Sequence, residues 1–249
     1  MIPKIIHYVW LGNKELPVMV KKCIKSWKKY CPDYEIKRWD ETNLDIDCCK
    51  YCRDAYDAKK YAFASDVLRF LILKNEGGIY LDVDVELLKP LDDLLEEKCF
   101  MGYECCGKRL YVAPGLIIGS EKNGKVVSEI YQSYLESSFY VGNDINYETV
   151  CVRTTNILIK NYNLEPNGRT VHFEDISIYA PEYFCPLDGE SKEIRFLTEK
   201  TYSKHLYLAS WVKKPPLHKR FASKMKSILR KIIGKKNYNK LKQKVKGEK

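Results

Sequence analysis

The spacing of apolar positions changes period repeatedly along the first forty residues. Residues 5–10 are dense in β-branched and aromatic side chains, as in a buried strand, and Gly12-Asn13 follows as a turn signal. Residues 17–30 suit a helix that opens at a proline, and residues 34–39 alternate apolar with polar side chains, as a strand does. A strand, a helix and a second strand in this order predict a βαβ unit and therefore an α/β fold.

The longest helical pattern covers residues 55–76, where apolar side chains recur every three or four positions. Gly77-Gly78 ends this helix, because glycine readily adopts the left-handed backbone found at helix ends. Beyond it the pattern predicts a strand over residues 79–85, a strand pair within residues 98–119 and a helix over residues 124–137, while residues 139–210 give no clear period.

Two acidic side chains stand in the predicted strand, as Asp82-Val83-Asp84. Residues two apart on a strand face the same side, so both carboxylates would lie together, and such a pair repels unless a cation separates the charges or one is protonated. Hard oxygen ligands suit Mn²⁺ or Mg²⁺ held together with phosphate oxygens. The pair therefore indicates a metal site for a diphosphate at the carboxyl end of a strand. An edge strand with a polar face is the alternative, which Glu86 on the same face favours.

The predicted helix before this strand carries Ser65, Asp66 and Arg69. The spacing allows Asp66 and Arg69 to share a helix face. An aspartate accepts hydrogen bonds from sugar hydroxyls, and an arginine binds phosphate. These residues are candidates for donor binding, and a surface ion pair is the alternative.

Charge divides the chain into two parts. Residues 213–249 contain fifteen Lys or Arg and one acid, a net charge of +14, so residues 1–212 carry −4 of the total of +10. We expect an α/β domain over residues 1–212 and a basic tail over residues 213–249. Apolar residues of the tail fall on one helical stripe, at Phe221, Met225, Ile228, Leu229, Ile232 and Ile233.

A basic amphipathic helix of this kind is typical of membrane-surface binding, so residues 217–249 are predicted to contact anionic lipid. A helix packed on the domain with a solvated basic face is the alternative. Nucleic-acid binding is disfavoured, because the tail has few aromatic side chains to stack on bases. No apolar stretch approaches the ~20 residues that cross a bilayer, and no secretory signal opens the chain. The expected location is therefore the cytoplasm, peripheral on the inner face of the plasma membrane.

The ten cysteines are expected to be reduced thiols in that compartment. Cys48-Cys49-x-x-Cys52 and Cys105-Cys106 are their only clusters, and a zinc site that joins the two is the alternative interpretation.

Four blocks of the sequence, spread over roughly residues 2–212, resemble the signature blocks of the DXD sugar-transferase family, also called glycosyltransferase family 32. The family contains bacterial capsular polysaccharide glycosyltransferases and yeast initiating mannosyltransferases, and it is related to the large clostridial glucosylating toxins. The blocks are residues 5–12 (IIHYVWLG), 64–69 (ASDVLR), 77–84 (GGIYLDVD) and 201–211 (TYSKHLYLASW).

The resemblance implies a GT-A fold, which is a single α/β domain around a Rossmann-like mixed sheet, and retention of the donor's anomeric configuration. It also implies roles for individual residues. In the donor site, Trp10 would stack on the nucleotide base, and Ser65 and Asp66 would hold ribose or sugar hydroxyls. Arg69 would bind phosphate or sugar, Tyr80 and Asp82 would contact the donor, and Trp211 would touch the diphosphate. In the metal site, Asp84 with Asp82 would bind the metal, and His205 or Ser210 would complete the metal shell.

The function so implied is transfer of a hexose, from a nucleotide-sugar of the UDP type, to a glycan or lipid-linked glycan acceptor in surface or capsular polysaccharide synthesis. Arg69, Asp82 and Asp84 would be the catalytic residues. Residues 153–156 (RTTN) depart from the Thr-Gly-Pro-like turn of many relatives, so acceptor contacts cannot be inferred. A catalytically inactive module that binds a membrane or nucleic acid through its tail is the competing function.

Overall fold

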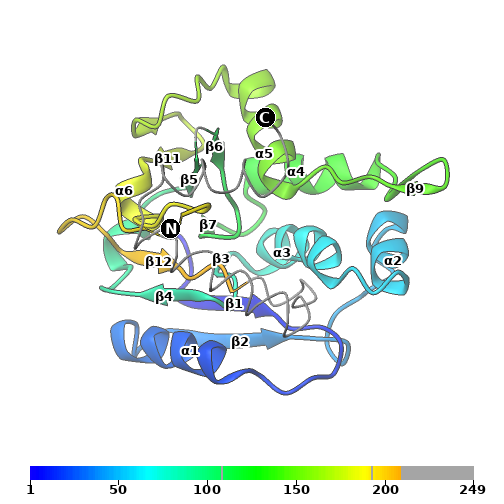
Figure 1. Cartoon of the computed structure of the whole chain (residues 1–249), viewed down its shortest axis with the longest axis horizontal. Coiled ribbons are helices and arrows are strands. Elements are labelled where there is room, and N and C mark those ends of the chain that lie inside the picture. The colour runs from blue at the N-terminus through cyan, green and yellow to red at the C-terminus, as the bar shows by residue number, and fades with distance from the viewer. Residues whose placement is uncertain (108, 192, 209–249) are drawn as a thin grey trace, which may run out of the picture. The chain divides into compact units, whose positions relative to one another are not determined.

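A computed structural model describes residues 1–107, 109–191 and 193–208 of the chain. Within it, Met1–Leu208 form one compact unit built on a mixed β-sheet with helices on both faces (Figure 1). The expected α/β class and mixed sheet are therefore confirmed. The predicted boundary after residue 212 and the basic helix of the tail lie outside the described residues.

The central sheet has eight strands. In spatial order they are β10 (Val171–His172), β11 (Ser177–Tyr179), β5 (Cys99–Cys106), β7 (Ile118–Ser120), β3 (Gly78–Tyr80), β1 (Ile5–Val9) and β2 (Glu35–Trp39), and β6 (Arg109–Val112) pairs with β5.

Strand direction explains where a site can form. β1 runs parallel to both β2 and β3, whereas β7 is antiparallel to β3 and to β5. The predicted βαβ unit is confirmed, because helix α1 (Val18–Tyr30) connects β1 to β2 and begins directly after Pro17. Because β1, β2 and β3 are parallel, their carboxyl ends meet at one edge of the sheet, which is where open α/β sheets bind ligands.

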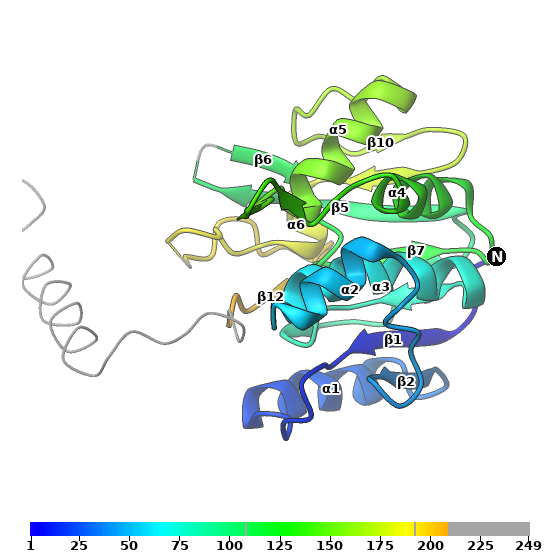
Figure 2. The ribbon, with the colours of Figure 1, turned by 90° about the vertical axis from the view of Figure 1, so that its right-hand side faces the viewer.

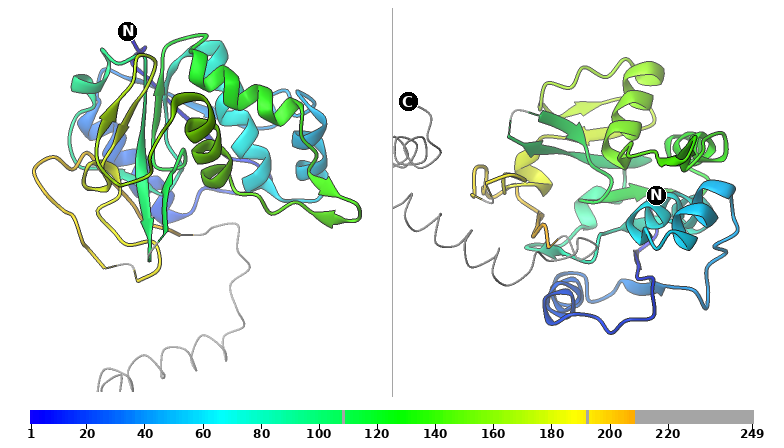
Figure 3. Two further views of the ribbon diagram at one scale, coloured as in Figure 1. Left: turned by 90° about the horizontal axis from the view of Figure 1, so that it is seen from above. Right: turned by 45° about the vertical axis from the view of Figure 1, so that its right-hand side comes forward.

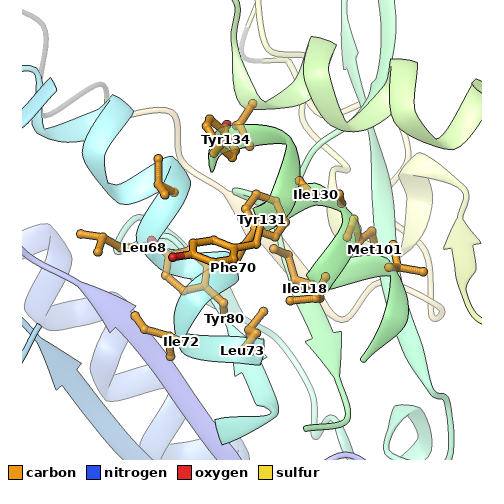
Figure 4. Packing of buried hydrophobic residues seen from close by; sticks show 14 of the residues in the cluster. Leu68, Phe70, Ile72, Leu73, Tyr80, Met101, Ile118, Ile130, Tyr131 and Tyr134 are labelled. Atoms are coloured by element: carbon orange, nitrogen blue, oxygen red, sulfur yellow. The ribbon is translucent and has the colours of Figure 1, made fainter. Parts of the chain in front are cut away.

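Each face of the sheet is covered by its own set of helices, because residues along a strand alternate between the two faces. One face packs against four helices and the other against α1 and a short helix (Figure 2). In the close-up, Phe70 of α3 and Tyr131 of α4 pack over the first face, beside Ile118 of β7 (Figure 4). The helices are α2 (Lys50–Asp57), α3 (Tyr61–Glu76), α4 (Lys125–Leu135) and α5 (Val150–Tyr162) on the first face, and α6 (Pro181–Phe184) on the second.

The predicted helix over residues 55–76 is interrupted at residues 58–60. α2 ends at Asp57 and α3 begins at Tyr61, with Lys59 between them at φ +56°. The N–H of Lys60 donates to the carbonyl of Ala55 (2.9 Å), which closes a left-handed helix end of the kind usually made by glycine. No glycine or proline marks this break, and the sequence pattern therefore ran through it.

The predicted strand over residues 79–85 is also divided. β3 ends at Tyr80, β4 (Val85–Leu87) begins at Val85, and residues 81–84 form a turn between them. β4 pairs antiparallel with β12 (Ser203–His205), outside the central sheet. The remaining elements are the 3₁₀ turn η1 (Asp92–Leu94) and the hairpin of β8 (Tyr140–Val141) and β9 (Asp144–Ile145), which extends beyond the end of α4 (green in Figure 3).

No helix among the described residues is both long and apolar enough to cross a bilayer. The nine cysteines whose side chains the structure describes form no disulfide with one another, and none belongs to a converging group of potential metal ligands within the described ranges. The alternative zinc site that would join the two cysteine clusters therefore finds no support among these residues.

Candidate active site

The Asp82-Val83-Asp84 segment lies just beyond the carboxyl end of β3, in a turn closed by a hydrogen bond from the N–H of Val85 to the carbonyl of Asp82 (3.0 Å). The N–H of Asp82 donates to the carbonyl of Gly115 (3.2 Å), which anchors the turn to the loop after β6. The two carboxylates therefore come together in a turn and not on one face of a strand. The predicted proximity of Asp82 and Asp84 holds, but the predicted strand geometry does not.

His205 reaches Asp84 because β12 lies beside β4, with His205 opposite Val85. The distance from Nε2 of His205 to Oδ1 of Asp84 is 2.9 Å, and the N–H of Leu208 donates to Oδ2 of Asp84 (2.8 Å). Burial disfavours both charges, but this hydrogen-bonded contact outweighs it, so the pKa of Asp84 is lowered and the pKa of His205 is raised. The two groups form a charged pair at the edge of the sheet.

The two aspartates and the histidine fit a divalent cation. One ligand atom from each of Asp82, Asp84 and His205 lies within 4.8 Å of the others. Nδ1 of His205 is buried and has no hydrogen-bond partner among residues 1–107, 109–191 and 193–208, which leaves the bonding capacity of this nitrogen unused within them. Carboxylate oxygens and imidazole nitrogen together suit Mn²⁺, and the oxygens alone suit Mg²⁺. The structure thus brings together three of the four predicted metal ligands, whereas Ser210 lies outside the described residues.

Arg69 of α3 links this cluster to the helix. Its side chain is buried, with Nη2 at 2.6 Å from Oδ1 of Asp66 and at 3.4 Å from Oδ1 of Asp82. The guanidinium also lies over the ring of Tyr80, at 4.8 Å from its centroid. Burial opposes the charge of Arg69, but these neighbours raise its pKa above the ordinary value, so it is permanently cationic. Its Nη1 is buried and has no partner in the part of the chain that the structure describes. A buried guanidinium with an unused N–H is suited to bind an anion.

Two more predicted donor residues belong to the same group. The hydroxyl of Tyr80 donates to Oδ1 of Asp82 (3.2 Å), and Nη2 of Arg69 lies 3.5 Å from Oγ of Ser65. Ser65 donates to the carbonyl of Ala62 (2.8 Å), so its hydroxyl is oriented by the helix backbone. Burial raises the pKa of Asp82, partly offset by Arg69. These residues form one hydrogen-bonded network with the carboxylates.

Gly115 was not found from the sequence, although Pro114-Gly115 is a turn signal. A Cβ at this position would overlap Oδ2 of Asp82 and would lie 3.5 Å from Nη1 of Arg69. The loop backbone therefore approaches the two charged groups more closely than any residue with a side chain permits. Glycine at this position leaves open the space that Asp82 and Arg69 face.

Trp10 follows β1 at the same edge of the sheet. β1 and β3 are parallel with His7 beside Tyr80, so Trp10 and the Asp82 turn lie beyond the carboxyl ends of neighbouring strands. The indole nitrogen of Trp10 donates to the carbonyl of Lys14 (2.6 Å), and the side chain is half-buried. No described contact joins Trp10 to the carboxylates, and Trp211 lies outside the described residues, so base stacking and the diphosphate contact remain predictions.

The four residues that depart from the expected turn, residues 153–156, lie inside α5. Arg153 forms an ion pair with Glu148 (2.6 Å) and donates to the carbonyl of Ser133 (2.9 Å). Thr155 accepts a hydrogen bond from the N–H of Val112 (2.9 Å), which attaches the helix to β6. These contacts give the segment a structural role in holding α5 against α4 and the sheet.

Residues 17–101, which include the Asp82 turn, match the family described as "Glycosyltransferase sugar-binding region containing DXD motif". This match confirms, over residues 17–101, the resemblance seen in the sequence.

Named relatives agree with this class. Inositol phosphoceramide mannosyltransferase 3 of Schizosaccharomyces pombe is 41% identical over 98 residues, which are 38% of this chain and 27% of that protein. An uncharacterized glycosyltransferase of Acanthamoeba polyphaga mimivirus is 28% identical over 219 residues, covering 85% of this chain and 84% of that protein. The chain therefore spans about a quarter of the length of the first relative and most of the second. Among solved structures, a PaToxG glycosyltransferase is similar with a TM-score of 0.47 and 19% identity, over 65% of this chain and 70% of that one.

Proposed function

We propose that this protein transfers a hexose from a nucleotide-sugar to a glycan or lipid-linked glycan, with a divalent cation as cofactor. The observation that carries the proposal is the convergence of Asp82, Asp84 and His205 within 4.8 Å, beside the buried guanidinium of Arg69. Such a site offers two carboxylates and an imidazole to a cation and an unused N–H to an anion. A nucleoside diphosphate chelated to a metal needs both.

Asp82, Asp84 and His205 would hold Mn²⁺ or Mg²⁺. When bound, the cation supplies electrostatic stabilisation to the negative charge that develops on the departing diphosphate. Arg69 adds a fixed positive charge at the same place, and its Nη1 is oriented before any ligand arrives. Pre-oriented charge of this kind is commonly the largest single contribution to catalysis.

The remaining residues of the network set the position of Arg69. Asp66 holds the guanidinium from the helix side, and the ring of Tyr80 lies beneath it. A guanidinium held by two carboxylates and an aromatic ring loses little freedom when it binds an anion. Ser65 is proposed to bind a ribose or sugar hydroxyl beside it.

We infer transfer with retention of configuration by attack on the front face of the sugar. The bond from the anomeric carbon to the phosphate oxygen breaks, the bond to the acceptor oxygen forms on the same face, and the acceptor proton passes to the departing phosphate oxygen. This route needs no protein nucleophile. It leaves Asp82 and Asp84 as donor and cation ligands.

The donor is proposed to be a UDP-sugar, and the process surface or capsular polysaccharide synthesis. The 41% identical relative is named a mannosyltransferase acting on inositol phosphoceramide, so mannose is a second candidate sugar, and the name supports an acceptor that carries a lipid. A lipid-linked acceptor accords with the proposed location on the inner face of the plasma membrane, held there by residues 217–249.

The test is hydrolysis of UDP- and GDP-sugars by purified protein, with Mn²⁺ and with a chelator. The proposal expects one nucleotide to be released only when Mn²⁺ is present. Release that is unaffected by the chelator would overturn the role of the cation, and no release from any sugar nucleotide would overturn the donor class.

Membrane attachment is tested separately by deletion of residues 217–249. The truncated protein is expected to stay in solution with anionic vesicles that retain the full chain, and to hydrolyse the donor at the same rate. Equal retention of both proteins would refute the role of the tail.

A further inference from the structure

Tyr207 has an unusual backbone conformation directly beside the cation site. Its φ is +50°, in the left-handed region that bulky residues rarely adopt. Such conformations persist where the surrounding contacts enforce them, and they concentrate at functional sites. The residue lies two positions beyond His205 in the chain, and neither the sequence blocks nor the proposed mechanism assigns it a role.

The left-handed turn at Tyr207 allows two backbone groups to reach the same aspartate. The N–H of Leu206 donates to the carbonyl of Asp84 (2.9 Å), and the N–H of Leu208 donates to Oδ2 of Asp84 (2.8 Å). In an extended strand, N–H groups two residues apart point the same way at a spacing too wide for one residue to accept both. The chain therefore bends around Asp84 at Tyr207.

The Tyr207 side chain is held between His205 and a buried thiol. Its ring centroid lies 4.3 Å from that of His205, with the planes at 63°, an edge-to-face contact. Its hydroxyl lies 3.0 Å from Sγ of Cys185. Because the Cys185 thiol already donates to the carbonyl of Leu187 (3.3 Å), the tyrosine hydroxyl is the donor to the sulfur.

We propose that Tyr207 is a positioning residue for the cation site, which holds the His205 imidazole against Asp84 and fixes the backbone that wraps this carboxylate. The inference rests on the proposed function for the identity of the ligand, but the positioning is a property of the metal-free protein. The histidine ring has one nitrogen on Asp84 and the other without a partner, so its orientation depends on what packs against its face and edge.

Two substitutions separate the ring from the backbone. Tyr207→Gly removes the ring and keeps the left-handed conformation accessible, whereas Tyr207→Phe keeps the ring and removes the hydrogen bond to Cys185. Asn163→Gly is the matched control, because Asn163 has φ +54° at the C-terminal end of α5, away from the site. Thermal unfolding of each variant shows whether it is folded.

The first measurement is Mn²⁺ affinity of the metal-stripped protein, by calorimetry. Loss of a residue that orients a metal-ligating histidine typically weakens binding about 10–100-fold, which is the expectation for Tyr207→Gly. The Mn²⁺ affinity of Tyr207→Phe is expected to fall by less than about 10-fold relative to the parent protein. Asn163→Gly is expected to bind Mn²⁺ with the affinity of the parent. Equal affinity of Tyr207→Gly and Asn163→Gly would overturn the proposal.

The second measurement is the ¹⁵N spectrum of the His205 imidazole without metal. One set of sharp ring resonances is expected in the parent and in Tyr207→Phe, and exchange-averaged resonances in Tyr207→Gly. An unchanged His205 spectrum in Tyr207→Gly would refute the positioning role. A parent protein that binds no Mn²⁺ would refute the proposed function instead, and the spectrum would still decide the role of Tyr207.

Discussion

Among the residues that the structure describes, two clusters join a histidine to a carboxylate, and they differ in how fully their polar atoms are bonded. At one edge of the sheet, Ser177 donates to Glu97 (2.7 Å), Tyr179 donates to the same carboxylate (2.9 Å), and Nδ1 of His172 lies 2.8 Å from the Ser177 hydroxyl. Each group in this cluster has a partner. It connects β10 and β11 to the segment before β5.

The cluster of Asp82, Asp84 and His205 is bonded less completely. Nδ1 of His205 and Nη1 of Arg69 are buried and have no partner among the described residues, and the backbone nearby is left-handed at Tyr207. Native proteins rarely leave buried polar atoms unbonded, and here two of them lie beside the same pair of aspartates. A histidine and an acid occur in both clusters, so the difference between the clusters is this convergence of unbonded nitrogens with two carboxylates.

The largest expected effect comes from removing a cation ligand. Asp84→Ala is expected to lower Mn²⁺-dependent donor hydrolysis by at least about 10³-fold, because the charge on the departing diphosphate loses its counterion. Glu97→Gln is the matched change in the fully bonded cluster. It is expected to leave hydrolysis within about two-fold and to reduce the free energy of unfolding by about 1–2 kcal/mol. The rate of donor hydrolysis and the free energy of unfolding in urea are measured for both variants. A large loss of hydrolysis in Glu97→Gln with little loss in Asp84→Ala would contradict the distinction between the two clusters.

Arg69→Met is expected to rank second. Removal of the guanidinium leaves the half-buried carboxylates of Asp66 and Asp82 without a counter-charge, which costs about 1–3 kcal/mol of unfolding free energy, and it lowers hydrolysis by about 10²–10³-fold. Arg69→Lys keeps a positive charge but cannot contact Asp66 and Asp82 with one planar group. Relative to Arg69→Met, it should therefore recover more of the free energy of unfolding than of the hydrolysis rate. Equal recovery of both by lysine would show that only the charge matters.

Gly115→Ala is expected to lower hydrolysis by about 10–100-fold, because the added methyl group displaces the Asp82 carboxylate. In an Asp82→Ala background the displaced group is absent, so the same substitution should have little further effect. This double-mutant cycle separates displacement of Asp82 from general damage to the loop. Additive losses in the double variant would contradict the steric account.

The smallest expected effect on donor hydrolysis concerns His7, a third histidine that is fully buried in β1 and that acts on stability instead. Nδ1 of His7 accepts from the indole of Trp39 (3.0 Å), so Nε2 carries the hydrogen and donates to the carbonyl of Gly77 (2.8 Å). Burial lowers the pKa of His7 from 6.5 to about 4, partly offset by the Gly77 hydrogen bond.

The sign of the pH effect follows from this depressed pKa. Between about pH 6.5 and pH 4 the unfolded chain takes up a proton that the folded chain excludes, so stability is retained above this window and falls within it, by about 3 kcal/mol in total. Urea unfolding of the parent and of His7→Gln across this range measures the effect. A parallel pH dependence in the two proteins would contradict it, and His172→Gln serves as the exposed control.

Much of the fold could be predicted from the sequence, because the apolar periods of β1, α1 and β2 are long and end at clear signals. The break between α2 and α3 could not, since a lysine occupies the left-handed position that glycine usually marks. The turn at residues 81–84 was likewise hidden, because Leu81 and Val85 are both buried and continue the apolar alternation of a strand.

The residues of the candidate site likewise divide into those that the sequence predicts and those that it does not. Arg69, Asp82 and Asp84 lie close together in the sequence, and their spacing and the resemblance were enough to find them. Gly115 and Tyr207 act through tertiary contacts with distant residues, so no local pattern reveals them. His205 lies between these cases, because only the family blocks connected it to Asp84, from which it is separated by 121 positions in the sequence.

The central claim is that Asp82, Asp84 and His205 bind a divalent cation that holds the nucleotide diphosphate. Its most direct test is anomalous diffraction at the manganese edge, from crystals grown with Mn²⁺ and the nucleoside diphosphate that the hydrolysis panel identifies. The account predicts a manganese peak in contact with the Asp84 carboxylate and the diphosphate, with His205 or Asp82 completing the protein ligands. A diphosphate bound without manganese at these residues, or a peak elsewhere in the protein, would contradict it.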